Sequence, residues 1–218
     1  MSKATCFGWL CCLTLILLMF SASVKAETQR FALLVGAGDY QFLQDDVDLD
    51  GPANDVAELE KVALSQWQVP EDNVIKLVDS QATRANILSA LDTLDSRSKA
   101  GDWVFIYLSG HGTSSQGLEK NRLRFADLPD DSGAFIATDF RVKSATGEAL
   151  DTTELLKQML VGRWDLKPRL MKLDQKGVES FVVIDSCYSK NTFRDLAPRK
   201  AGVPRLVSFA AAKAGDGK

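Results

Sequence analysis

The chain has 218 residues, of which 45% are hydrophobic and 25% are charged, and its formal net charge is -3 at neutral pH. This is an ordinary globular composition, and so mild an acidic excess argues against nucleic acid or an acidic membrane surface as a partner. Residues 1–26 contain two lysines and no acidic residue, so the remainder carries a net charge of -5. That remainder is long enough for one domain with a sizeable core.

The first 26 residues have the pattern of a secretory signal peptide. Lys3 gives a positive start, residues 10–20 form an apolar core, and Val24 and Ala26 occupy the -3 and -1 positions of a cut after Ala26. An uncleaved anchor is the alternative, because residues 4–24 carry no charge and approach the length of a membrane span. We predict a signal peptide at 1–26, a domain at 27–218 and an exported protein, periplasmic or secreted, with no membrane contact beyond an uncleaved leader.

Export changes the interpretation of the cysteines. Cys6, Cys11 and Cys12 lie in the leader, so Cys187 is the only cysteine that follows it, and His111 is the only histidine of the chain. A single cysteine cannot form a disulfide within the exported domain. Cys187 is therefore either a buried cysteine that packs as a small hydrophobic residue or a reactive thiol.

After the leader, apolar runs alternate with stretches of helical periodicity, which predicts a mostly parallel sheet covered by helices on both faces. Pro52 and Thr83 are typical of helix starts, and the polar stretch from Thr113 to Ser132 is predicted to be a long loop. In chain order the predicted elements are a strand at 30–35, a helix near 52–66, a strand at 74–78, a helix from 83 to about 94, a strand at 103–108, a helix near 152–160, and strands at 181–184 and 206–210.

His111 and Cys187 each follow a predicted strand. Ligands of open α/β sheets bind beyond the carboxyl ends of the strands, so we expect the two side chains to converge there. A nearby imidazole can take the proton of a thiol and so produce a nucleophilic thiolate. Gly110 and Gly112 would leave room for a substrate backbone, and the N–H groups of Gly112 and Cys187 could stabilise an oxyanion. The alternative is that Gly110 and Gly112 are ordinary turn residues with no role in catalysis.

The sequence around these two residues resembles the His and Cys motifs of bacterial metacaspases, within the caspase superfamily. The motifs are Tyr-Leu-Ser-Gly-His-Gly at 107–112 and Val-Ile-Asp-Ser-Cys-Tyr-Ser at 183–189. Residues 50–56 and 82–87 are similar to the starts of the first two helices of the family, and the likeness extends over roughly 29–213. The resemblance implies a three-layer αβα caspase-hemoglobinase-like fold. It also implies a cysteine-type endopeptidase, in which a Cys187 thiolate forms an acyl-enzyme and His111 is the general base.

The resemblance also assigns a substrate pocket. Asp55, Ser109 and Asp185 match the positions that bind the substrate residue before the cut, which is Arg or Lys in metacaspases. Two carboxylates that face a pocket favour a guanidinium or ammonium group on physical grounds as well. The alternative for Asp55 is compensation of the helix dipole. We therefore expect peptide or protein substrates that are cut after Arg or Lys.

Three features depart from the family pattern. Lys190 stands where the family has Gly, and His111 and Cys187 are 76 positions apart, against about 50 in caspases. The chain also ends soon after its fifth predicted strand, where the family continues into a smaller second portion. We therefore expect a large-subunit-like portion with only the start of the small-subunit-like portion, and a partner chain that completes the fold is one explanation.

The residues themselves assign no cofactor and no metal site. Calcium enters through the resemblance, since many metacaspases require it, and oxygen ligands are available, although without EF-hand spacing: Asp130, Asp131, Asp139 and Asp151. A solvated acidic loop is the simpler explanation of these carboxylates.

Two other functions are compatible with the same residues. One is a catalytically silent caspase-fold interaction module. The other is a different thiol enzyme that uses the same pair, such as an amidase or a transpeptidase.

Overall fold

The computed structural model describes residues 27–114, 132–187 and 207–211. Within them, five strands form one sheet in the order β2-β1-β3-β7-β8, and every neighbouring pair is parallel. This confirms the predicted mostly parallel sheet. The strands are β1 (Arg30–Gly36), β2 (Val74–Val78), β3 (Trp103–Ser109), β7 (Glu179–Asp185) and β8 (Val207–Ala211).

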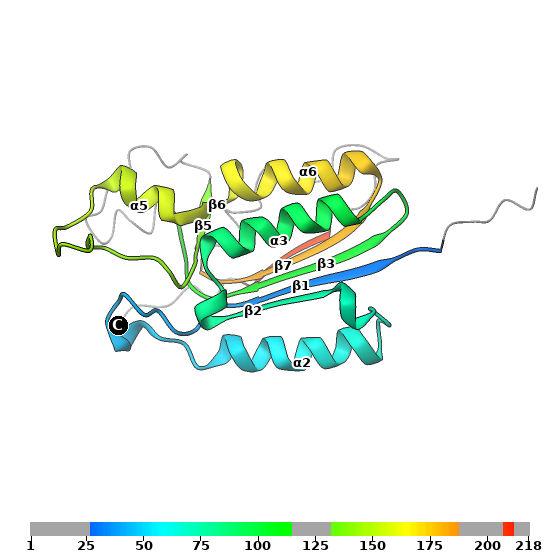
Figure 1. The fold of residues 1–218 in the computed structure, drawn as a ribbon, viewed down its shortest axis with the longest axis horizontal. Helices are drawn as coiled ribbons and strands as arrows, with labels where there is room; N and C mark the ends of the chain where they lie inside the picture. Colours follow the sequence, from blue (N-terminus) through cyan, green and yellow to red (C-terminus); the bar gives the residue numbers. More distant parts are fainter. Residues whose placement is uncertain (1–26, 115–131, 188–206, 212–218) are drawn as a thin grey trace, which may run out of the picture.

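Helices cover both faces of this sheet, as predicted. Figure 1 shows α2 (Gly51–Ser65) on one face, and α3 (Arg84–Arg97) and α6 (Lys167–Lys176) on the other. The fold is therefore the three-layer αβα arrangement expected from the sequence. None of the helices within the described ranges combines the length and the apolar character of a membrane span. The predicted leader at 1–26 and the departure at Lys190 lie outside the described residues.

The alternation of side chains along the strands produces two separate cores. Residues of β1 and β3 that face α2 pack with that helix, and their neighbours in sequence face α3 and α6. The first core includes Ala32, Leu34, Val56, Ala63, Phe105 and Tyr107. The second includes Leu33, Val35, Leu91, Leu94, Ile106, Leu108 and Leu170. Because β1 and β3 are buried on both faces, they read as continuous apolar runs, and this is why sequence alone locates them.

The predicted helix start at Thr83 is confirmed in detail. The Thr83 side chain accepts a hydrogen bond from Asn86 N at the beginning of α3. This interaction satisfies one of the backbone donors that the first turn of a helix leaves unpaired.

A second, antiparallel sheet lies at the carboxyl end of the main sheet, where Figure 1 shows β5 and β6. It consists of β4 (Gly112–Ser114), β5 (Gly133–Ile136) and β6 (Met159–Val161). One prediction is wrong here, and another, the helix near 152–160, is confirmed apart from its last two residues. Thr113 and Ser114 form a buried strand instead of starting a loop, and the helix predicted near 152–160 ends earlier, as α5 (Thr152–Gln158). Pairing with β5 explains both differences, because the ladder draws these residues into extended backbone.

Four short helical turns complete the described structure. They are η1 (Asp45–Val47), η2 (Glu71–Asn73), η3 (Asp79–Gln81) and the π-helix η4 (Gly162–Leu166), which links β6 to α6. Neither η4 nor α6 is predicted from the sequence.

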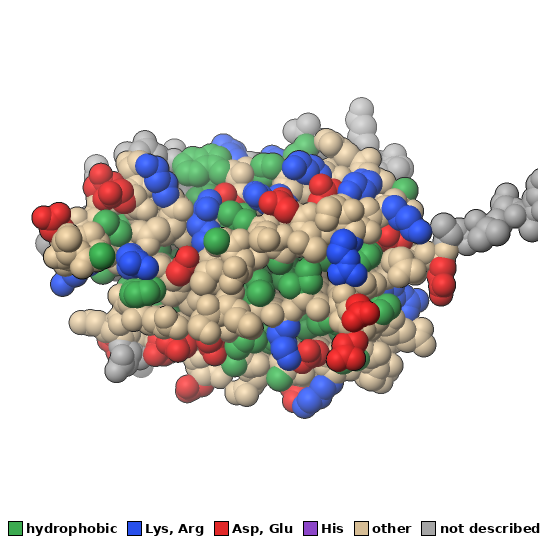
Figure 2. Space-filling view, viewed as in Figure 1, with side chains coloured by type: hydrophobic (Ala, Val, Ile, Leu, Met, Phe, Trp, Pro, Cys, Tyr) green, Lys and Arg blue, Asp and Glu red, His purple; other side chains and the backbone are tan. Residues whose placement is uncertain are grey.

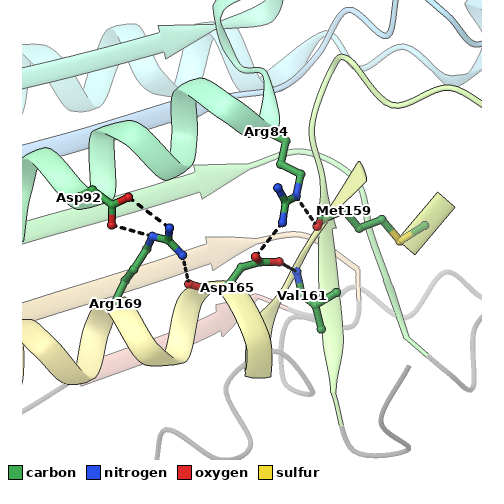
Figure 3. Close-up of polar contacts among 6 residues, drawn as sticks. All are labelled: Arg84, Asp92, Met159, Val161, Asp165 and Arg169. Atoms are coloured by element: carbon green, nitrogen blue, oxygen red, sulfur yellow. Dashed lines mark hydrogen bonds and ion pairs between the residues drawn. The ribbon is translucent and has the colours of Figure 1, made fainter. Parts of the chain in front are cut away.

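Arg84, at the start of α3, links that helix to the small sheet through hydrogen bonds. Its guanidinium bonds to Asp165 in η4, with Nη2 at 2.7 Å from Oδ1, and donates from Nε to Met159 O at 2.9 Å. Asp165 in turn accepts a hydrogen bond from Val161 N at 2.8 Å. Figure 3 shows these contacts converging on β6. Because β4 begins directly after His111, a fixed small sheet also fixes the chain that leaves the histidine.

Candidate active site

The carboxyl ends of β3 and β7 bring the His and Cys motifs together. The two strands are neighbours, with Ser109 opposite Asp185, and the next residue, Gly110, donates a backbone hydrogen bond to Asp185 O at 3.2 Å. The chain segments that carry His111 and Cys187 therefore leave the sheet side by side. This is the rim at which α/β sheets bind their ligands.

Gly112 lies directly against the residue pair 186–187. A Cβ built on Gly112 would lie 2.2 Å from Cys187 O and 2.7 Å from Ser186 Oγ, so no side chain fits there. The glycine after His111 thus permits the close approach of the two motifs, a physical reason beyond that of a plain turn. The Cys187 side chain is exposed and His111 is half-buried, so the cysteine is not a buried packing residue.

The His111 imidazole is oriented by a backbone carbonyl. Its Nε2 lies 2.6 Å from the carbonyl oxygen of Val47 at the end of η1. A carbonyl can only accept a hydrogen bond, so the neutral imidazole must carry its proton on Nε2. In that form its Nδ1 carries no proton. Sequence reasoning does not predict Val47, because a backbone acceptor leaves no trace in the residue type.

Tyr40 is a second neighbour of His111 that the sequence does not predict. It is 2% exposed, and its ring lies 5.0 Å from the imidazole, centroid to centroid. Its hydroxyl accepts a hydrogen bond from His111 N at 2.8 Å and donates one to Ile136 O at 3.2 Å. Burial raises the pKa of Tyr40 well above its ordinary value, so the hydroxyl stays protonated and keeps both interactions.

The three predicted pocket residues surround one tyrosine of β3. Tyr107 Oη donates to Asp55 Oδ2 at 3.4 Å, and the Tyr107 hydroxyl also interacts with the Ser109 side chain. Burial raises the pKa of Tyr107 to about 12; the hydrogen bond with Ser109 opposes this rise, and the charges of Asp55 and Asp185 add to it. The structure therefore brings Asp55, Ser109 and Asp185 together on the α2 face of the sheet, next to the cysteine.

The surroundings of this cluster are acidic. Asp55 and Asp185 are both exposed, whereas Ser109 is buried. Figure 2 shows acidic side chains gathered over the loop that precedes α2, where Asp46 and Asp50 are also exposed. Grouped carboxylates of this kind create a negative potential that attracts cationic ligands.

The described carboxylates among the possible calcium ligands accept hydrogen bonds from the backbone. Asp139 Oδ1 accepts a hydrogen bond from Arg84 N at 2.9 Å, and Asp151 caps α5 by accepting one from Glu154 N at 2.8 Å. Across 27–114 and 132–187 there is no group of three or more His, Cys, Asp or Glu residues arranged to hold a metal ion. Asp130 and Asp131 lie outside the described residues.

Comparison with known proteins decides the family. The model of the metacaspase, peptidase C14 domain, matches residues 30–196. The chain belongs to the metacaspase family. The resemblance seen in the two motifs is thereby confirmed, and with it membership of a cysteine peptidase family with a caspase-like fold.

Several curated metacaspases are similar over most of this metacaspase chain. Metacaspase-1 of Plasmodium falciparum is 28% identical over 78% of the chain and 25% of its own length. Metacaspase-1 of Lodderomyces elongisporus is 32% identical over 74% of the chain and 33% of its own length, and metacaspase-1A of Aspergillus oryzae is 32% identical over 73% and 34%. The chain thus spans 25% to 34% of the length of these relatives. Among solved structures, a protein from Geobacter sulfurreducens aligns with a TM-score of 0.48 and 20% identity, over 73% of this chain and 50% of that one.

Proposed function

We propose that this chain hydrolyses peptide bonds after Arg or Lys, with the Cys187 thiolate as nucleophile and His111 as general base. The observation that carries the proposal is the contact between Gly112 and the backbone of Cys187, which places the two motifs against each other at one rim of the sheet. Membership of the metacaspase family supports a cysteine peptidase.

The orientation of His111 suits the role of base. With Nε2–H donated to Val47 O, the lone pair of Nδ1 takes the proton of Cys187 Sγ. The sulfur then attacks the substrate carbonyl carbon, and the N–H groups of Gly112 and Cys187 stabilise the oxyanion that forms. The imidazolium gives its proton to the leaving amine, which leaves a thioester on Cys187. Water, deprotonated by His111, hydrolyses this thioester and restores the thiol.

The pocket supports the choice of a basic residue before the cut. Asp55 and Asp185 are exposed and share Tyr107 as a neighbour, so a guanidinium or ammonium group near Tyr107 would interact with both carboxylates. An acidic substrate residue would be repelled by the same two charges. Electrostatics therefore favours Arg or Lys over Asp.

Peptide hydrolysis tests this function directly. The purified chain is given fluorogenic peptides that differ only in Arg, Lys or Asp before the scissile bond, and Cys187→Ala and His111→Ala are measured beside it. We expect release from the Arg and Lys peptides and none from the Cys187→Ala protein. Absence of release from all three peptides would contradict a peptidase. Product ligated to an added amine in place of hydrolysis would indicate a transpeptidase instead.

We also propose export, with cleavage after Ala26. The charge and apolar pattern of residues 1–26 supports this proposal. Expression in a bacterial host, followed by cell fractionation and amino-terminal sequencing, tests it. An exported protein that begins at Glu27 is expected, and one retained in the membrane with Met1 in place would indicate an anchor.

A further inference from the structure

The loop that follows β1 contacts His111 through the Val47 carbonyl and through the ring and hydroxyl of Tyr40. We name residues 37–49 the histidine clasp. We propose that the clasp is a positioning device for the catalytic base, in which Tyr40 holds His111, Asp48 holds Tyr40, and Asp79 holds the backbone just before Tyr40. This inference rests on the proposed function, because it takes His111 to be the base.

The clasp is closed at its base and tied to β3. Leu49 N donates to Gly38 O at 3.0 Å, which closes the loop on itself, and Ala37 N donates to Ser109 O at 2.8 Å. A Cβ on Gly38 would lie 2.5 Å from Leu49 O, so the closure leaves no space for a side chain. The loop is thus a compact unit attached two residues before His111.

Tyr40 touches His111 at both the backbone and the ring. Its hydroxyl accepts the His111 N–H at 2.8 Å, and its ring lies 5.0 Å from the imidazole at an angle of 43°. A Cβ on Gly110 would lie 3.0 Å from the Tyr40 hydroxyl oxygen, so the residue before His111 also leaves room for this contact. One side chain therefore restrains the position of the His111 backbone and the plane of its imidazole.

The Asp48 carboxylate restrains the backbone of Tyr40 in turn. Asp48 Oδ1 accepts the Tyr40 N–H at 2.9 Å, and the next residue back along the chain, Val47, supplies the carbonyl that binds His111 Nε2. Asp48 thereby links the two parts of the clasp that contact the histidine. Asp48 is exposed to solvent, and its carboxylate still makes this hydrogen bond to the backbone of Tyr40.

Asp79 holds the other side of the clasp. Its Oδ1 accepts the backbone N–H groups of Gly38 and Asp39, each at 3.0 Å. Asp79 has a φ of 45°, in the left-handed region that non-glycine residues rarely adopt. Its own carbonyl accepts from Thr138 Oγ1 at 2.7 Å, beside β5. A residue held in such a conformation by several contacts indicates a position that the fold enforces.

The chemical consequence concerns the tautomer of His111. A neutral imidazole is free to carry its proton on either nitrogen, and the hydrogen bond at one nitrogen decides which form is present. The clasp keeps Val47 O against Nε2 and so keeps Nδ1 free as the base. A purely structural role for Tyr40 would affect stability and leave the tautomer unchanged.

The chain offers a clean readout, because His111 is its only histidine. Full-length protein labelled with ¹⁵N-histidine is examined by NMR at alkaline pH, and kcat and KM are measured on an Arg peptide. The variants are Tyr40→Leu, Asp48→Ala and the conservative Asp48→Asn, which keeps an acceptor oxygen. Leu173→Ala is the control: this buried residue of α6 lies near the start of β7, at the end of the strands opposite to His111, and should lower stability alone.

We expect one tautomer, protonated at Nε2, in the wild-type protein, in Asp48→Asn and in Leu173→Ala. Tyr40→Leu and Asp48→Ala should give mixed tautomers and a kcat about tenfold lower, the equivalent of one lost hydrogen bond, with KM little changed. If Tyr40→Leu does not fold, Asp48→Ala decides. A single Nε2–H tautomer and unchanged kcat in Asp48→Ala would overturn the proposal. A wild-type protein with the Nε2–H tautomer, shifted in the variants, but with no peptidase activity would refute the proposed function and leave the clasp intact.

Discussion

His111 Nε2 and the carbonyl oxygen of Val47 lie 2.6 Å apart, although the two residues are separated by 64 positions. The interaction joins the loop after β1 to the loop after β3, across neighbouring strands of the sheet. The exposed thiol of Cys187 follows the neighbouring strand β7 at the same rim of the sheet. A histidine oriented by an acceptor is what the proposed role of His111 as a base requires.

The first prediction concerns the close approach of the two motifs. Gly112→Ala places a methyl group where Cys187 O lies, so the segments must separate and the proposed oxyanion donors must move. We expect peptidase activity to fall by about a hundredfold or more, the usual cost of losing an oxyanion donor. Gly51→Ala, at the start of α2 with its nearest neighbour at 3.7 Å, controls for replacement of a glycine as such. Similar activity of the two variants would contradict the close-contact account.

The second prediction concerns specificity. Asp55→Asn and Asp185→Asn each remove one negative charge from the pocket around Tyr107. We expect kcat/KM for Arg peptides to fall by about tenfold in each, in line with the loss of one charge-assisted hydrogen bond, and the ratio of Arg to uncharged peptides to fall with it. Glu58→Gln, an exposed acid on the same helix, is the matched control and should leave the ratio unchanged. Equal effects of all three substitutions would assign the preference to general surface charge.

The third prediction compares the two arginines of Figure 3. The Arg84 and Asp165 side chains are 28% and 14% exposed, and Arg84 also donates a hydrogen bond to Met159 O, so Arg84→Met leaves partly buried polar groups without their partner. The expected loss is about 3 kcal/mol in the free energy of unfolding. Arg169 pairs with Asp92, which is half exposed, so Arg169→Met should cost about 1 kcal/mol or less. Urea unfolding measures both, and a larger loss for Arg169→Met would contradict this ranking.

The fourth prediction is a pH dependence that follows from Tyr107. Its pKa rises from 10.0 to about 12 on folding, mainly through burial, so the folded state holds the phenol proton more tightly than the unfolded state. The resulting stabilisation is complete below pH 10 and is lost as pH rises toward about 12. Tyr107→Phe should lose stability less steeply than the wild-type protein over that interval, as measured by urea unfolding at each pH. Parallel curves would show that Tyr107 titrates normally.

The sequence predicts the main sheet well because its strands are unusual. β1 and β3 are buried on both faces, so they read as uninterrupted apolar runs, and the chemistry-bearing residues follow them at once. The placement of His111 and Cys187 at one rim follows from that topology and needs no information beyond strand order. The pocket residues are different, because the family resemblance assigned them and Asp55 lies in the helix α2.

Other parts of the fold and of the site give only weak signals in the amino-acid sequence. In α6 only Leu170 and Leu173 are buried, and the surrounding lysines and arginines hide the helical period. The strands of the small sheet have three or four residues, too short for a pattern to emerge. Val47 acts through its backbone, and Tyr40 is a single aromatic residue in a polar loop, so neither can be distinguished from its neighbours by residue type.

Covalent labelling tests the central claim most directly. A peptide that carries Arg and a thiol-reactive group at the position of the scissile carbonyl is incubated with the full-length chain, and the adduct is located by peptide mass mapping. The account predicts one adduct, on Cys187, that forms much more slowly in His111→Ala. An adduct that forms equally fast without the histidine, or Cys187 left unmodified in folded protein, would contradict the pairing of these two residues.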